Sequence, residues 1–120
     1  MPNWEFANYE IEDSEDNIAM LDAAFDAAKE IESESDFGPT WLGNLMLKIG
    51  YKYDDVCHRT NGCPNARGSI TDRWAVRNTL TVQTETAWEP LDECMVEFIR
   101  YFCPDASIYR TQMVEYTEEL

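Results

Sequence analysis

Polar and hydrophobic residues alternate near the start of the chain, in the segment WEFANYEIE at residues 4–12. This alternation predicts a β-strand that places Ala7, Tyr9 and Ile11 on one face. Trp4 and Phe6 then fall on the opposite face of the strand. We therefore expect that the second face is not fully hydrated.

The hydrophobic repeat changes to steps of three and four residues after residue 14, which predicts an amphipathic α-helix. Ser14 is a good N-cap, and Glu15 and Asp16 follow it where carboxylates favour the positive end of a helix. The apolar face consists of Ile18, Leu21, Phe25, Ala28 and Ile31. Three acidic residues recur on the opposite face at steps of four, namely Asp22, Asp26 and Glu30. Their repulsion costs roughly a few tenths of a kcal/mol per pair, so packing of the apolar face must dominate.

A short apolar segment, WLGNLMLKI at residues 41–49, predicts a second helix. Thr40 would cap this helix and Gly50 would end it. Gly43 inside the helix costs about 1 kcal/mol relative to alanine. This cost indicates either a close packing contact or a functional approach to the backbone. Residues 51–68 carry turn signals and predict an irregular segment.

Two further strands are predicted at residues 69–76 and 79–88, joined by a tight hairpin at Arg77 and Asn78. Pro90 suits the first turn of the helix that follows, and Pro104 ends that helix. Its apolar stripe consists of Leu91, Cys94, Met95, Phe98, Ile99 and Phe102. Residues 107–116 predict a final strand.

The order of these elements is strand, helix, short helix, strand, strand, helix, strand. This order predicts an α+β protein with the ferredoxin-like split βαβ arrangement. We expect a four-stranded antiparallel sheet with two main helices on one face, plus a short extra helix after the first main helix. The length of 120 residues predicts a single domain over residues 1–120.

The chain is strongly acidic, with 9 basic and 24 acidic residues and a net charge of −15. Residues 1–36 carry twelve of the acidic residues against Lys29 alone. Such a surface repels phosphate backbones and favours solubility or partners with basic surfaces, so direct nucleic-acid binding is not expected. RNA-recognition domains share the predicted topology but stack bases on a basic sheet. Here the third strand has no basic residue and no aromatic residue before Trp88.

The first residues lack the basic and apolar regions of a signal peptide, and no apolar run is long enough to span a membrane. We therefore expect a cytoplasmic protein whose four cysteines are reduced thiols.

Metal and cofactor sites are not expected. Cys57, His58 and Cys63 supply at most three zinc ligands, and the adjacent Cys57 and His58 do not easily face the same ion. Cys94 and Cys103 would point to nearly opposite sides of the last helix, so they cannot share an iron–sulfur cluster. We expect Cys94 to lie in the core. A disulfide between Cys57 and Cys63 remains open geometrically, although a cytoplasmic setting disfavours it.

The sequence also predicts no catalytic residues. A catalytic Cys–His pair normally meets through space rather than as sequence neighbours. The 24 carboxylates offer many acid–base combinations, and no particular pair stands out.

Four short segments occur in one order along the chain, namely MPNW at residues 1–4, WLGN at 41–44, RGSI at 67–70 and ETAWEP at 85–90. Together they resemble the YubB-like ferredoxin-fold family, small bacterial proteins of plasmids, phages and other mobile elements. The resemblance runs from Met1 to about Tyr116 and implies a ferredoxin-like fold without an iron–sulfur cluster. The family has no established biochemical activity, so the resemblance supplies no catalytic residues. The chain departs from the family at Ala66, where many members have cysteine, and many members continue beyond the final strand.

We therefore expect a non-enzymatic protein-binding or accessory module of a bacterial mobile element. The candidate contact residues are Trp41, Asn44, Arg67, Trp88 and Glu89. One alternative is an acidic mimic of DNA that inhibits a DNA-processing enzyme. A second alternative is a small enzyme with an unrecognised carboxylate or Cys/His site.

The four tryptophans bear on this choice, because tryptophan is enriched at the centres of protein interfaces. Each one is still more often a core residue. Exposed tryptophans on the open face of the sheet would favour an interface, and burial of all four indoles would weigh against one. We expect Trp88 to cover the seam between the third strand and the last helix.

Overall fold

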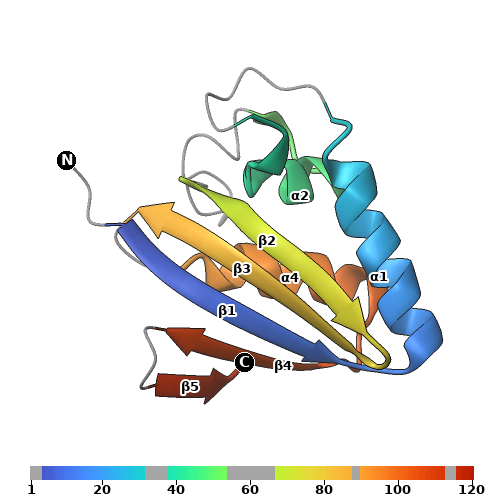
Figure 1. Cartoon of the computed structure of the whole chain (residues 1–120). Helices are drawn as coiled ribbons and strands as arrows, with labels where there is room; N and C mark the ends of the chain where they lie inside the picture. The colour runs from blue at the N-terminus through green and yellow to red at the C-terminus, as the bar shows by residue number, and fades with distance from the viewer. Residues whose placement is uncertain (1–3, 32–37, 54–66, 88–89, 113–115) are drawn as a thin grey trace.

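The computed structural model describes residues 4–31, 38–53, 67–87, 90–112 and 116–120 of the chain (Figure 1). The elements, in chain order, are β1 (Trp4–Glu12), α1 (Glu15–Ala28), the 3₁₀ turn η1 (Gly38–Thr40), α2 (Gly43–Lys48), β2 (Gly68–Val76), β3 (Thr79–Ala87), α4 (Asp92–Phe102), β4 (Ser107–Gln112) and β5 (Tyr116–Glu119). None of the helices within these ranges is long and apolar enough to cross a membrane.

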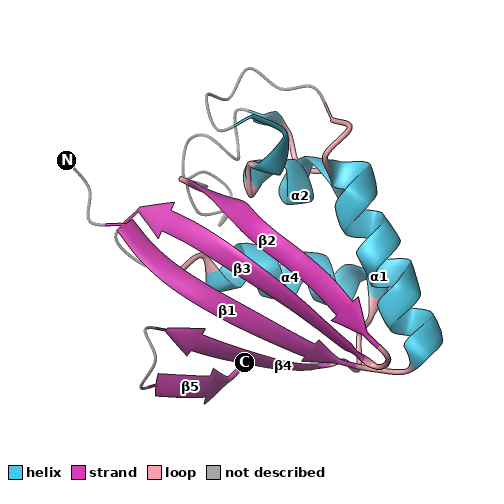
Figure 2. Cartoon of the chain, in the orientation of Figure 1, coloured by secondary structure: helices cyan, strands magenta, loops and turns pink. Residues whose placement is uncertain are grey.

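The five strands form one sheet in the order β2-β3-β1-β4-β5, and every neighbouring pair is antiparallel. β1 lies at the centre of this sheet. Helices α1 and α4 lie on one side of the sheet, and α2 lies near the beginning of β2 (Figure 2). The fold is therefore α+β, as the sequence predicted, with three α-helices among the described residues.

The first two elements form where the hydrophobic pattern predicts them. Along β1, Ala7, Tyr9 and Ile11 are buried while the residues between them are not. Helix α1 begins at Glu15, and the Ser14 hydroxyl accepts a hydrogen bond from the Asn17 backbone N–H at 3.2 Å. The predicted cap is confirmed, and so is the apolar face from Ile18 to Ala28, whereas Ile31 lies beyond the end of the helix.

The second helix starts later than predicted. Thr40 belongs to η1 rather than capping a helix, and α2 begins at Gly43 without a side-chain cap. Gly43 is needed because a methyl group there would overlap the buried indole of Trp41. The close packing contact that this glycine indicated is thus confirmed. Gly50 follows the helix with a positive φ of 109°, which glycine adopts readily.

The sheet has five strands where the sequence predicted four. The predicted final strand ends at Gln112, and Tyr116–Glu119 return beside it as β5. The backbone N–H of Leu120 donates to the Ile108 carbonyl at 2.8 Å.

The Arg100 guanidinium donates to the carbonyls of Pro104 and Ala106 at 2.9 and 3.0 Å, which fixes the connection from α4 into β4.

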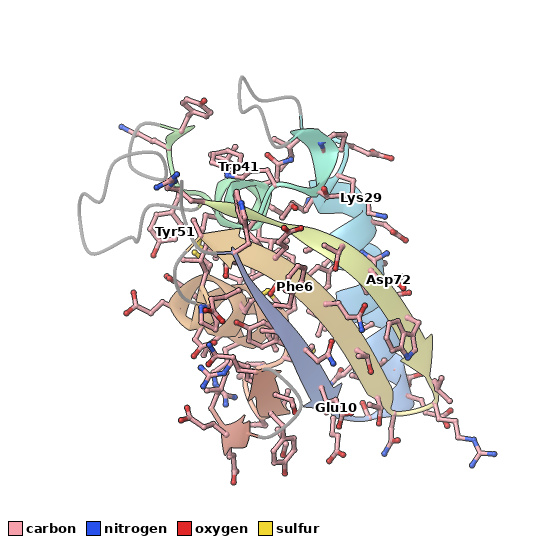
Figure 3. All side chains as sticks on the ribbon, turned by 60° about the vertical axis from the view of Figure 1, so that its left-hand side comes forward. Phe6, Glu10, Lys29, Trp41, Tyr51 and Asp72 are labelled. Atoms are coloured by element: carbon pink, nitrogen blue, oxygen red, sulfur yellow. The ribbon has the colours of Figure 1, made fainter. Side chains whose placement is uncertain are left out.

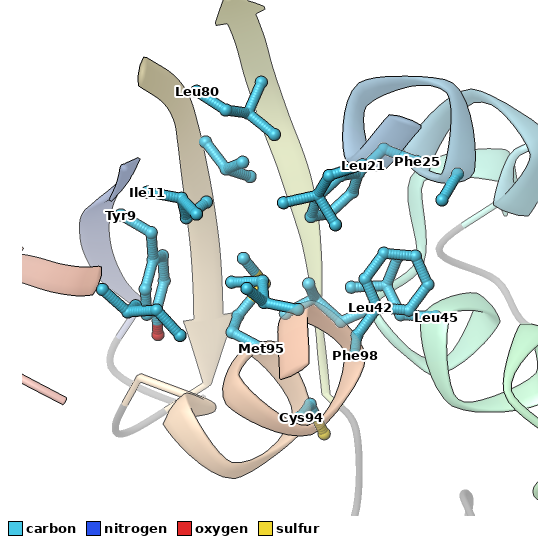
Figure 4. Packing of buried hydrophobic residues seen from close by; sticks show 14 of the residues in the cluster. Tyr9, Ile11, Leu21, Phe25, Leu42, Leu45, Leu80, Cys94, Met95 and Phe98 are labelled. Atoms are coloured by element: carbon cyan, nitrogen blue, oxygen red, sulfur yellow. The ribbon is translucent and has the colours of Figure 1, made fainter. Parts of the chain in front are cut away.

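The core lies between the sheet and the helices. Figure 4 shows the side chains of Leu21, Phe25, Met95 and Phe98 from the helices facing those of Tyr9 and Ile11 from β1. The Phe25 and Phe98 rings pack with their centroids 4.8 Å apart. Cys94 is fully buried in this cluster, as predicted.

Candidate functional site

The face of the sheet away from the helices carries large hydrophobic side chains that remain accessible. Trp4 and Phe6 of β1 are 40% and 57% exposed, and Trp74 and Val76 of β2 are 43% and 62% exposed. We call this surface the open face. Aromatic side chains exposed on a sheet are a common basis for recognition, because they provide large contact areas at a low entropy cost.

The strand register places these residues in two groups. Trp4 and Phe6 lie on alternate positions at one end of β1, and Phe6 is paired with Glu85 of β3. Trp74 and Val76 lie at the other end of the sheet on β2, where Trp74 is paired with Thr81. Polar residues of the central strands separate the two groups.

The open face is also acidic. Its carboxylates, at positions set by the pairing of the strands, are Glu10, Glu12, Asp72, Glu85 and Glu119. No lysine or arginine of the described strands lies on this face, because Arg73 and Arg110 both fall on the helix side of the sheet. Figure 3 shows Phe6 and Glu10 of β1 on the same side of the sheet. The surface therefore combines apolar contact area with a negative potential.

A hollow of about 490 Å³ lies in the middle of the open face. It is lined by residues from four strands, among them Phe6, Asn8, Thr71, Gln83 and Thr111. A β-bulge between Ile70 and Asp72 leaves Thr71 without a partner on β3. Such bulges bend a strand locally and commonly lie beside binding sites.

Two of the sequence-predicted contact residues are in the interior. Trp41 and Asn44 are only 2% and 1% exposed. The Trp41 ring packs against Tyr53 with centroids 5.7 Å apart, and the Asn44 amide donates to the carbonyls of Ile31 and Pro39. Their burial leaves almost no surface for a partner, so their role in this structure is to hold α2 and the segment before it.

The other predicted contact residues do not form a surface with them. Arg67 is exposed, and its carbonyl accepts a hydrogen bond from the Ala87 N–H at 2.9 Å. Trp88 and Glu89 lie outside the described residues, and so does the predicted role of Trp88 at the seam. Phe6 and Trp74 were not among the contact residues predicted from the sequence. For Phe6, the outward position in the alternating pattern of β1 could have indicated such a role.

The described parts of the four segments that carry the family resemblance meet at one end of the sheet. Trp41 forms a bridge with Ser69, and the Leu42 N–H donates to the Gly68 carbonyl at 3.0 Å. Gly68 is in turn paired with Thr86 on β3. Ala87, the next residue on β3, is paired with Trp4 of β1. These short segments therefore form a structural junction between α2 and three strands.

The acidic face of α1 has a partner that the sequence did not reveal. The Arg73 guanidinium lies 2.8 Å from the Asp22 carboxylate, bonds Asp26, and lies over the Phe25 ring. The hydrogen bond from Arg73 lowers the pKa of Asp26 below its ordinary value. This cluster joins α1 to the edge strand β2, and it explains how the helix tolerates its acidic residues.

A second polar cluster lies on the helix side of the sheet. Arg110 of β4 bonds Asp92 at the start of α4 and donates to Glu118 of β5 at 2.9 Å. The Tyr9 hydroxyl donates to the same Asp92 at 2.7 Å. Burial, followed by this hydrogen bond, raises the pKa of Tyr9 far above its ordinary value. The cluster ties β1, α4, β4 and β5 together, and the Tyr9 hydroxyl within it is buried.

Metal-binding and thiol chemistry find no support in the described ranges. No group of three His, Cys, Asp or Glu residues there could hold a metal ion. Cys94 and Cys103 are buried free thiols, and burial raises the pKa of Cys103. The Cys103 thiol donates to the Asn17 carbonyl at 3.6 Å. Cys57, His58 and Cys63 lie outside the described residues.

Comparison of the chain with protein-family models, with curated proteins and with solved structures finds no match. The function must therefore be inferred from the open face itself.

Proposed function

We propose that this protein is a non-enzymatic binding module that recognises a basic protein surface through the open face of its sheet. The observation that carries the proposal is the combination of exposed Trp4, Phe6 and Trp74 with a set of carboxylates and no basic side chain on the same described strands. Apolar anchors supply affinity, and complementary charge supplies orientation and a faster association rate.

A protein partner fits this face better than a nucleic acid does. A sheet that binds RNA offers aromatic side chains together with lysine and arginine. The open face has the aromatic residues but the opposite charge, so it would repel a phosphate backbone. A basic peptide or protein surface complements both features.

The strand order supports a finer description of the fold. In the order β2-β3-β1-β4, the central pair consists of the first and third strands, which is what the split βαβ arrangement requires. We assign the chain to the ferredoxin-like folds, with β5 added at one edge. We further place it in the YubB-like family, as an accessory protein of a bacterial mobile element that acts in the cytoplasm. These assignments rest on the order of the elements and on the four short sequence segments.

The proposal is tested by affinity capture from a bacterial lysate with matched variants. The double variant Phe6→Ser and Trp74→Ser removes apolar area from the open face without changing its charge. Tyr101→Ser is the matched control, because Tyr101 is 64% exposed but lies on α4, in the helix layer. The wild type and the control should retain the same basic proteins at low salt, and the double variant should lose them. Equal capture by all three proteins would contradict the proposal.

Mimicry of DNA makes a different prediction in the same experiment. A DNA mimic depends on its carboxylates, so a DNA-processing enzyme would be captured equally by the double variant and released steeply by salt. Capture that depends on Phe6 and Trp74 distinguishes the open-face proposal from mimicry.

A further inference from the structure

The hollow on the open face has a defined chemical character. Asn8 and Gln83 are paired across β1 and β3, so their carboxamides lie side by side. Neither side chain has a hydrogen-bond partner among the described residues. Both carboxamide oxygens are therefore available to a donor from a partner, and Thr71 also lines the same hollow.

An aromatic ring and three carboxylates surround these acceptors. Phe6 lines the hollow two residues before Asn8 and is more than half exposed. Asp72 is paired with Gln83, Glu85 is paired with Phe6, and Glu10 follows Asn8 on the same face. The residues that line the hollow are thus uncharged, and the residues that surround it carry negative charge.

A guanidinium group fits this combination better than other ligand groups. It is planar, donates up to five hydrogen bonds, stacks on aromatic rings, and is more weakly hydrated than an ammonium group. A carboxylate or phosphate would be repelled, and an apolar side chain would leave the two carboxamides without partners. The volume of about 490 Å³ also lies within the range of small-ligand pockets, about 300–1,000 Å³.

We infer that the hollow binds an arginine side chain of the basic partner. The guanidinium would lie against the Phe6 ring and donate hydrogen bonds to the Asn8 and Gln83 carboxamides, with the surrounding carboxylates balancing its charge. This inference rests on the proposed function, because it assumes that the open face receives a basic protein segment.

The test compares two short peptides, acetyl-Gly-Arg-Gly-Arg-Gly-amide and its lysine counterpart, by titration calorimetry at low salt. Both carry the same charge, so a difference between them reports the guanidinium. The arginine peptide should bind at least about twofold more tightly, because a guanidinium stacks on a ring and is more weakly hydrated than an ammonium group. Phe6→Leu and Gln83→Met should each remove this preference.

Val76→Thr is the matched control for these variants. Val76 lies on the open face but is paired with Thr79 at the far end of the sheet, away from the hollow. It should leave the arginine-to-lysine ratio unchanged. The thermal stability of each variant is measured alongside, and two independent variants keep the test decisive if one of them does not fold.

The possible results separate the inference from the proposed function. Equal affinity for both peptides, with binding still lost in the variant lacking Phe6 and Trp74, would overturn the arginine site and leave the open-face proposal standing. A preference for arginine that survives both Phe6→Leu and Gln83→Met would also overturn the inference. Binding of neither peptide, together with no capture of a basic protein, would overturn both.

Discussion

Gly43 and Gly68 each allow an approach that a larger residue would prevent. A Cβ atom at Gly68 would lie 2.6 Å from the Glu85 carbonyl oxygen and 2.7 Å from the methyl carbon of Thr86 on the neighbouring strand. At Gly43 it would overlap the indole of Trp41. Because Trp41 is buried, its ring has little room to move away. The two glycines thus fix the junction between α2 and the end of the sheet.

Substitution of Gly43 by alanine sets two effects against each other. Alanine is favoured over glycine inside a helix by about 1 kcal/mol, whereas overpacking a core costs about 1–3 kcal/mol. We expect the steric overlap to dominate, so Gly43→Ala should lower the free energy of unfolding in urea denaturation. The cost should decrease when Trp41 is first replaced by the smaller phenylalanine. A more stable Gly43→Ala variant would show that helix propensity dominates instead.

At the scale of elements, two arginines that point toward the helix layer join segments distant in the sequence. Arg73 connects β2 to α1, and Arg110 connects β4 to α4 and β5. Arg73 also lies on the edge strand beside a β-bulge. Inward charges and bulges at sheet edges are known to discourage pairing with other chains. These two features disfavour pairing of another chain with β2, which supports the proposed use of the open face.

Replacement of Arg73 by methionine should have an effect that depends on pH. At neutral pH we expect a loss of about 1 kcal/mol, the scale of partly exposed ion pairs. Because Arg73 lowers the pKa of Asp26 from its ordinary value of 3.8, its contribution is present above that pH and is lost as Asp26 becomes protonated below it. The difference between wild type and Arg73→Met in urea denaturation should therefore be smaller at about pH 3 than at neutral pH. A difference that grows on acidification would contradict this assignment.

The elements with strong local patterns could be predicted from the sequence. The alternation in β1, the cap of α1 and the short hairpin at Arg77 and Asn78 are all local features, and the structure confirms them. Arg77 adopts a positive φ of 55°, as tight hairpin turns often require. The division of the last strand into β4 and β5 was missed, because no glycine, proline or asparagine interrupts residues 107–119.

The candidate site could be predicted only in part. The outward positions of Trp4 and Phe6 follow from the alternating pattern, and the two side chains are 40% and 57% exposed. The hollow depends on four strands in register and on a bulge, and no local pattern reveals either. Trp41 and Asn44 were selected as contact residues because they belong to WLGN, one of the four segments that carry the family resemblance. Such a short segment gives no information on whether its side chains are buried.

At the scale of the whole molecule, charge and apolar area are arranged on different surfaces. Part of the acidic face of α1 is balanced by Arg73, whereas the carboxylates of the open face have no basic neighbour on the described strands. If the proposed function is correct, the net charge of −15 would draw basic partners from a distance, and the exposed aromatic residues would determine where they bind. The proposed function therefore depends on whether a partner binds the open face.

The most direct measurement of this claim follows the tryptophan indole N–H signals by NMR during titration with a captured basic partner or the arginine peptide. Trp4 and Trp74 are exposed on the open face, and buried Trp41 is an internal control within the same sample. We predict that the Trp4 and Trp74 signals shift in proportion to binding while the Trp41 signal stays in place. Binding that leaves the Trp4 and Trp74 signals unchanged would show that the partner uses another surface and would contradict the account.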